Sequence, residues 1–287
     1  MKIYPSNIVV AFATLTLALS SQAAVVFTED FSDFATGQNI ASAERWNAKW
    51  TAEQQQLWTG TADQTATLDL SSAWNNFHAT YQEGFSLAGS ETATTSVDFR
   101  FTHNGLGTPS EVNKGFFGLG FAAENEWWEV TNRADARIAN RNGAVGMALT
   151  VAPWTEGWLS WGSLGVDPNG GVASTSSWLQ EEYTISVING TYHTQGVLLN
   201  ASGDTIFTGS QVDTGVAEST VIYATMTNGF VATGGTTTTE AFTNISSVEV
   251  DNFTVDLSAA AAVPEPSTYA ILIGLCSLGF VLIRRKK

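Results

Sequence analysis

The chain has 287 residues and a formal net charge of −15 at pH 7, with 27 acidic against 12 basic side chains. Five of the basic residues lie at the two ends, so the part between them is more acidic still. A surface of this charge repels phosphate backbones, which argues against nucleic acid as a partner. The only cysteine, Cys276, lies near the C-terminus, so the rest of the chain must be stabilised by packing without disulfides.

The N-terminus has the three parts of a secretory signal peptide. Lys2 precedes an apolar stretch over 8–19, which is followed by Ser21-Gln22-Ala23, a small-x-small pattern. A signal peptidase reads this pattern and cuts directly after it. We therefore predict a signal peptide at 1–23, export from the cytoplasm, and a mature chain that starts at Ala24.

Residues 24–257 show the period of β-strands. Between 94 and 101, Val97, Phe99 and Phe101 alternate with polar neighbours, as on a half-buried strand. Asn-Gly pairs at 104–105, 142–143, 189–190 and 228–229 are typical of tight turns. The sequence therefore predicts one all-β domain, a two-sheet antiparallel β-sandwich or a barrel, joined to the C-terminal segment by a linker at 258–263. Strands are expected at 25–31, 65–70, 94–101, 115–121, 144–151, 183–188, 196–199, 205–208, 220–226 and 248–257.

The two ends of this domain carry a family resemblance. VFTEDFSDF at 26–34 and SVEVDNFTVDL at 247–257 resemble the first and last strands of concanavalin A-like jelly rolls. In that family the two ends of the chain pair beside each other in one sheet. The resemblance implies a concanavalin A-like jelly roll for residues 24–257, with a different β-sandwich as the alternative.

Tryptophan is the first candidate for chemistry. Indoles have flat apolar faces that can stack on sugar rings, with one N–H donor at the edge. Trp154, Trp158 and Trp161 lie among Pro153, Gly157 and Gly162, which oppose burial in a regular strand. We predict these three as carbohydrate-binding residues, and packing in the core is the alternative. The ten tryptophans all fall inside the β domain, at 46, 50, 58, 74, 127, 128, 154, 158, 161 and 178.

The motif AENEWWEV at 123–130 contains three glutamates, Glu124, Glu126 and Glu129. Their spacing resembles the E-x-D-x-x-E signature of laminarinase-type glycoside hydrolases. The resemblance implies a nucleophile at Glu124, a helper at Glu126 and an acid/base at Glu129. Glu126 stands where that family has Asp, and Asn125 where it has an aliphatic residue, so a solvated acidic strand end is the alternative. We therefore expect a protein without enzymatic activity.

Metal ligands are sparse in the sequence. His78, His103 and His193 lie far apart and lack the spacing of a metal motif. Calcium prefers oxygen ligands from loops, and two pairs could supply some of them. These pairs are Asp167 with Asn169, and Asp30 with Asp251 if the terminal strands are neighbours. A structural calcium ion is therefore the one cofactor that the sequence suggests.

The C-terminal segment, 264–287, combines three signals in a fixed order. It begins with Pro264-Glu265-Pro266 and continues with an uncharged apolar run at 269–283. This run is short for a transmembrane helix, which needs about 20 residues, so it could span only a thin bilayer. The segment ends in four cations, Arg284, Arg285, Lys286 and Lys287.

This order closely resembles the PEP-CTERM sorting signal of Gram-negative bacteria. The resemblance implies an exosortase-type membrane protease as a partner and transient anchoring in the inner membrane through helix 269–283. It also implies cleavage near the motif and delivery to the cell surface or the exopolysaccharide matrix. An ordinary C-terminal membrane anchor is the alternative.

Together these features predict an exported, sorted surface or matrix protein that contacts glycans without catalysis. Two alternatives remain open at this point. One is a laminarinase-like hydrolase that uses the three glutamates, and the other is a purely structural matrix protein with no ligand.

Overall fold

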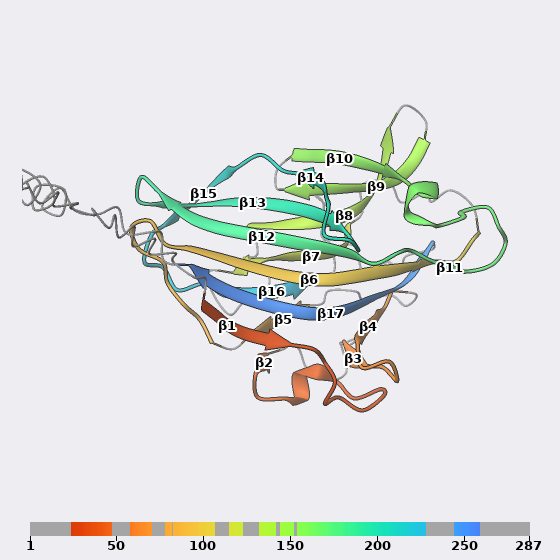
Figure 1. Ribbon diagram of the computed structural model, residues 1–287, viewed down its shortest axis with the longest axis horizontal. Helices are drawn as coiled ribbons and strands as arrows, with labels where there is room; N and C mark the ends of the chain where they lie inside the picture. Colours follow the sequence, from red (N-terminus) through yellow and green to blue (C-terminus); the bar gives the residue numbers. More distant parts are fainter. Residues whose placement is uncertain are drawn as a thin grey trace, which may run out of the picture. The chain divides into compact units, whose positions relative to one another are not determined.

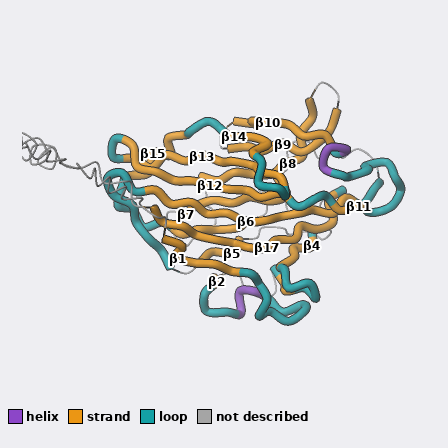
Figure 2. Tube along the Cα trace, viewed as in Figure 1, coloured by secondary structure: helices purple, strands orange, loops and turns teal. Residues whose placement is uncertain are grey.

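The computed structural model describes residues 24–47, 58–70, 78–81, 83–106, 115–122, 132–141, 144–151, 154–227 and 244–258 (Figure 1). All of them belong to one compact unit. They form strands and two short 3-10 helices, η1 (Ile40–Ser42) and η3 (Gly162–Leu164) (Figure 2). The predicted signal peptide at 1–23 and the sorting segment at 264–287 lie outside the described residues. Within the described part, no helix is long and apolar enough to cross a membrane.

The strands make two antiparallel sheets. The larger sheet has ten strands in the order β14-β13-β12-β6-β17-β4-β3, with β1 against β17, β11 against β6 and β15 against β13. The smaller sheet has seven strands in the order β10-β9-β8-β7-β16-β5-β2. The strands of the ten-stranded sheet are β1 (Ala24–Glu29), β3 (Thr59–Gly60), β4 (Ala66–Asp69), β6 (Thr92–His103), β11 (Ser174–Thr175), β12 (Leu179–Ile188), β13 (Thr191–Asn200), β14 (Thr205–Thr208), β15 (Val212–Ala217) and β17 (Ile245–Ser258). Those of the seven-stranded sheet are β2 (Trp46–Asn47), β5 (His78–Tyr81), β7 (Gly115–Ala122), β8 (Asn132–Arg141), β9 (Ala144–Val151), β10 (Trp154–Ser160) and β16 (Tyr223–Thr227).

The prediction of an all-β, two-sheet antiparallel sandwich is confirmed. The first and last strands pair as the jelly-roll resemblance implied, with Thr28 opposite Thr254 and Glu29 opposite Phe253. The predicted turn at Asn189-Gly190 is also present, since both residues have positive φ and Ile188 pairs directly with Thr191.

Aromatic side chains fill the space between the sheets. The burial of β6 alternates along its whole length, so one side of this strand faces the core. From that side Phe99 stacks on Phe117 of β7, with ring centroids 4.9 Å apart. Tyr183 of β12 stacks in the same way on Phe121 at 6.0 Å. This cross-sheet packing supplies the stability that disulfides would give in other exported proteins.

A buried carboxylate joins β1 to the segment that follows it. Glu29 is only 3% exposed and accepts three hydrogen bonds. Its Oε1 accepts from the backbone N–H of Phe31 at 3.0 Å, and its Oε2 accepts from Arg45 Nε and from Trp46 Nε1 at 2.9 Å. Arg45 also reaches Asp33 at 2.7 Å. The hydrogen bond to Glu29 raises the pKa of Arg45, so this guanidinium is firmly charged.

The two sheets also meet at one edge. β10 bulges between Glu156 and Leu159, and Gly157 in the bulge has a φ of +72°. A Cβ built on Gly157 would lie 2.8 Å from the ring of Phe207 on β14. The bulge therefore needs glycine twice, for its backbone conformation and for the approach of Phe207.

We expect Gly157→Ala to lower the free energy of unfolding by about 2 kcal/mol, because strain from positive φ and overpacking against Phe207 add together. Gly215→Ala is the matched control, since Gly215 has a φ of +70° but no atom within 4 Å of the position that a Cβ would take. Urea unfolding of both variants separates the two effects. Equal losses in both variants would show that the contact with Phe207 contributes nothing.

Candidate functional site

The tryptophan cluster predicted from sequence does not form one exposed platform. Trp161 is 4% exposed and belongs to the core. Its ring packs edge-on against Phe101 at 5.7 Å and lies 5.5 Å from the ring of His103. A ring enclosed in this way has no free face for a sugar, so Trp161 is a packing residue in this structure.

Trp154 and Trp158 lie on β10, at the edge of the seven-stranded sheet. Trp154 pairs with Val151 of β9, but its side chain is outside the described part. Trp158 is half-buried, and its ring lies against Gly146 of β9, where a Cβ would come within 3.0 Å of it. Its indole Nε1 is buried without a hydrogen-bond partner among the described residues. Binding of a glycan at these two residues stays a prediction.

The three glutamates of the hydrolase alternative, Glu124, Glu126 and Glu129, follow β7 in the sequence and lie outside the described residues. The predicted calcium ligands are partly visible. Asp167 accepts a hydrogen bond from Asn169 N at 3.0 Å in an exposed turn. Among the described residues, no group of three or more His, Cys, Asp or Glu side chains could hold a metal ion. Calcium therefore stays a prediction as well.

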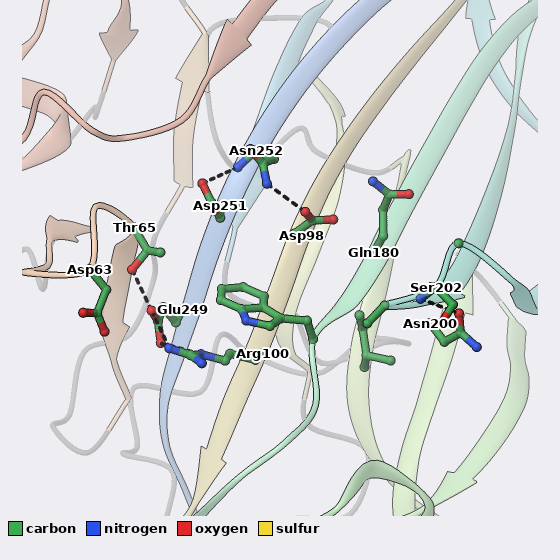
Figure 3. Close-up of a pocket in the computed structure, with 14 residues that line it drawn as sticks. Asp63, Thr65, Asp98, Arg100, Gln180, Asn200, Ser202, Glu249, Asp251 and Asn252 are labelled. Carbon is green, nitrogen blue, oxygen red and sulfur yellow. Dashed lines mark hydrogen bonds and ion pairs between the residues drawn. The ribbon is translucent and has the colours of Figure 1, made fainter.

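A different part of the molecule forms a hollow of about 790 Å³ on the solvent-facing side of the ten-stranded sheet. We call it the Trp178 hollow. Figure 3 shows Asp63, Thr65 and Glu249 on one side of it and Asn200 and Ser202 on the other, with Arg100, Asp98 and Gln180 between them. Its side chains come from the turn before β4, from β6 and β17, from the start of β12, and from the turn between β13 and β14.

Strand register explains why these residues meet. Because Phe99 and Val97 face the core, Asp98 and Arg100 face solvent. Gln180 of β12 pairs with Asp98 of β6, which pairs in turn with Asp251 of β17. These three polar residues therefore form one row across three strands.

The neighbouring row contains an ion pair. Arg100 lies opposite Glu249 and binds it in a bidentate way, with Nε to Oε2 at 2.7 Å and Nη2 to Oε1 at 2.9 Å. Thr65 donates a third hydrogen bond to Glu249 Oε1 at 2.7 Å. Burial alone would raise the pKa of Glu249, but the hydrogen bonds from Arg100 and Thr65 outweigh burial and lower it. The pair is therefore charged and rigid at neutral pH.

This ion pair also holds an aromatic ring. The Arg100 guanidinium lies over the ring of Trp178, with Cζ 4.5 Å from the ring centroid. Trp178 is half-buried, whereas Leu179 beside it is buried in the core and pairs with Phe99. The cation fixes the orientation of the indole at the wall of the hollow.

The other end of the hollow is acidic. Asn252 has a φ of +51° at a bulge in β17, and its Nδ2 donates to Asp98 Oδ2 at 2.9 Å. Burial raises the pKa of Asp251, and the charges of Asp98, Asp30 and Glu249 raise it further, against a hydrogen bond from Asn252 N. The charge of Asp30 thus acts on Asp251, as expected if the terminal strands are neighbours.

Comparisons with known proteins give one family match and several structural likenesses. Residues 262–286 match the PEP-CTERM protein-sorting motif. A search of curated proteins gave no match. Lectin II from Ulex europaeus is similar with a TM-score of 0.45 and 11% identity, over 82% of this chain and 100% of the lectin. Basic winged bean lectin is similar with a TM-score of 0.44 and 12% identity, over 82% of this chain and 99% of the lectin. Endo-1,3-beta-glucanase from Streptomyces sioyaensis is similar with a TM-score of 0.38 and 11% identity, over 83% of this chain and 98% of the glucanase.

The strand pairing shows the fold, and the match at the C-terminus shows the sorting motif. The match confirms the predicted motif at Pro264, Glu265 and Pro266 and extends through the apolar run and three of the four cations, to Lys286. Such a motif indicates a secreted protein that is sorted to the cell surface. The chain therefore carries a PEP-CTERM protein-sorting motif behind an all-β, antiparallel two-sheet sandwich.

Proposed function

We propose that this protein is an exported, exosortase-sorted component of the cell surface or the exopolysaccharide matrix, and that it binds carbohydrate without catalysis. The signal peptide at 1–23 directs export, and the segment at 264–287 holds the chain in the inner membrane until an exosortase-type protease cuts it. The β-sandwich at 24–257, followed by the linker at 258–263, is the part that acts outside. The sorting motif and the acidic composition support this assignment.

The Trp178 hollow is the observation that carries the binding function. Its volume of about 790 Å³ falls in the range of small-molecule sites, roughly 300–1,000 Å³. It combines a half-buried indole with amide and carboxylate side chains, including Gln180, whose side chain makes no hydrogen bond among the described residues. An apolar ring face with polar groups around it suits a sugar, whose C–H faces stack while its hydroxyls hydrogen-bond.

The test is retention of the full chain on immobilised polysaccharides, with the protein held in a polyoxyethylene detergent that contains no sugar. We expect Trp178→Ala to weaken binding roughly tenfold or more, since a stacked indole contributes about 1–3 kcal/mol. Trp158→Ala is the matched control because it removes another half-buried indole outside the hollow. Unfolding midpoints are measured for each variant.

Several outcomes would contradict this assignment. Loss of binding in Trp158→Ala alone would place the binding site on β10. Release of reducing sugar that Glu124→Gln abolishes would establish the hydrolase alternative, and no binding to any polysaccharide would leave a structural matrix protein. Each assay is run with calcium and with a chelator, so that a requirement for the predicted ion at the Asp167 turn becomes visible.

A further inference from the structure

We propose that the Trp178 hollow accepts uncharged and amine-bearing polysaccharides and excludes polyuronates and other polyanionic glycans. This inference rests on the proposed function and narrows the class of ligand for the same site. It follows from the charges in the hollow and from the contacts of Arg100, the one cation among the described residues that line it.

The described residues that line the hollow include four carboxylates, Asp63, Asp98, Glu249 and Asp251, against the single cation Arg100. A ligand carboxylate that enters would therefore face an excess of negative charge. Burial and, after it, the neighbouring carboxylates raise the pKa of Asp251, the direction expected where negative charge is crowded. A like charge brought into such a site is strongly rejected.

An arginine in a sugar site ordinarily indicates binding of a carboxylate, because its fork of N–H groups matches two carboxylate oxygens. In this hollow the fork is occupied from within. Arg100 Nε and Nη2 both donate to Glu249, and the guanidinium lies over one face of the Trp178 ring, with Cζ 4.5 Å from the ring centroid. Arg100 is therefore a positioning residue for the indole, and Glu249 occupies the Nε–Nη2 edge that a uronate would need for the same bidentate contact.

Two carboxylates in the hollow have acceptor oxygens left open. Asp98 Oδ2 accepts a hydrogen bond from Asn252 Nδ2, and Asp98 Oδ1 has no hydrogen bond within the described part of the chain. The carboxylate of Asp63 is likewise without a described hydrogen-bond partner and lies in an exposed turn. Free acceptors are complementary to donors, and the donors of a polysaccharide are its hydroxyls and its ammonium groups.

The test compares the full chain, in the same sugar-free detergent, on laminarin, on partially acetylated chitosan oligomers and on alginate of matched length. We expect the dissociation constant for alginate to be at least tenfold higher than that for laminarin at low salt. The difference should shrink as ionic strength rises, since screening weakens the repulsion.

Glu249→Gln is the informative variant because it removes one negative charge and releases the Arg100 fork. We expect the ratio of alginate to laminarin affinity to rise at least tenfold. Glu182→Gln is the control, since Glu182 lies on β12 outside the hollow and its removal changes the net charge equally without contacting Arg100. It should leave the ratio as in the wild type. If Glu249→Gln does not fold, Asp63→Asn in the exposed turn should raise the ratio by a smaller factor, about threefold.

The outcomes separate this inference from the function on which it rests. Alginate binding by the wild type as tight as laminarin binding would overturn the charge selection and leave carbohydrate binding intact. An unchanged ratio in Glu249→Gln would also overturn it. Failure to bind any of the three polymers would refute both the function and the selection.

Discussion

Glu29→Ala is expected to destabilise the sandwich by about 3 kcal/mol, because it leaves several donors without an acceptor. Trp46 Nε1, Phe31 N and Arg45 Nε all donate to this one carboxylate, which is only 3% exposed. Trp46 is itself a core residue, with its ring 5.1 Å from Phe253 of β17. Loss of Glu29 therefore loosens the contact between the first strand and the last.

The measurement is equilibrium unfolding in urea followed by tryptophan fluorescence. Glu29→Gln should lose less than Glu29→Ala, because its amide oxygen can still accept from one or two of the donors. Glu44→Ala is the matched control, since Glu44 is exposed and lies next to Arg45. A loss in Glu29→Ala no greater than that in Glu44→Ala would show that the network does not stabilise the fold.

The strands that the sequence predicts best are those with large apolar side chains at every second position. It places β6 and β17 to within a few residues because phenylalanine and valine recur with period two. Among the described strands of six or more residues, it does not predict β8, β10 or β15. In β8 the alternating apolar positions are mostly alanine, as at Ala136, and in β10 the bulge at Gly157 interrupts the pattern. A small side chain or a bulge removes the periodic signal while backbone pairing remains.

The candidate site cannot be found in the same way. Trp178 is one of ten tryptophans, and the sequence favours Trp161 because of its neighbouring glycines, whereas the structure buries Trp161. What distinguishes Trp178 is Arg100, which β6 supplies across the sheet, together with Glu249 from β17, far along the chain. The proximity of these three residues depends on strand order and register, and local sequence patterns carry no information on either. An arginine and a glutamate at solvent-facing positions of two predicted strands are the one hint that the sequence offers.

His103 gives the fold a pH dependence that can be measured. Its ring is buried, and its Nδ1 accepts from the backbone N–H of Gly105 at 3.0 Å. The proton therefore sits on Nε2, which has no hydrogen-bond partner among the described residues. Burial lowers the pKa of His103 from the ordinary value of 6.5, and the charge of Asp167 offsets this only in part.

Because the folded state holds the proton more weakly than the unfolded state, acid favours unfolding through this group. The contribution of neutral His103 to stability is complete above pH 6.5, the ordinary pKa. It is lost as the pH falls through the lowered pKa of His103 in the folded state. The urea midpoint of the wild type should thus fall between about pH 7.5 and 5.5 by more than that of His103→Asn. Asparagine can accept from Gly105 in place of Nδ1 but does not titrate. Parallel curves for the two proteins would show that His103 remains neutral, or is solvated, throughout this range. Since Asp251, Asp256 and Glu182 have raised pKa values and oppose the trend in acid, only the difference between the two proteins isolates the histidine.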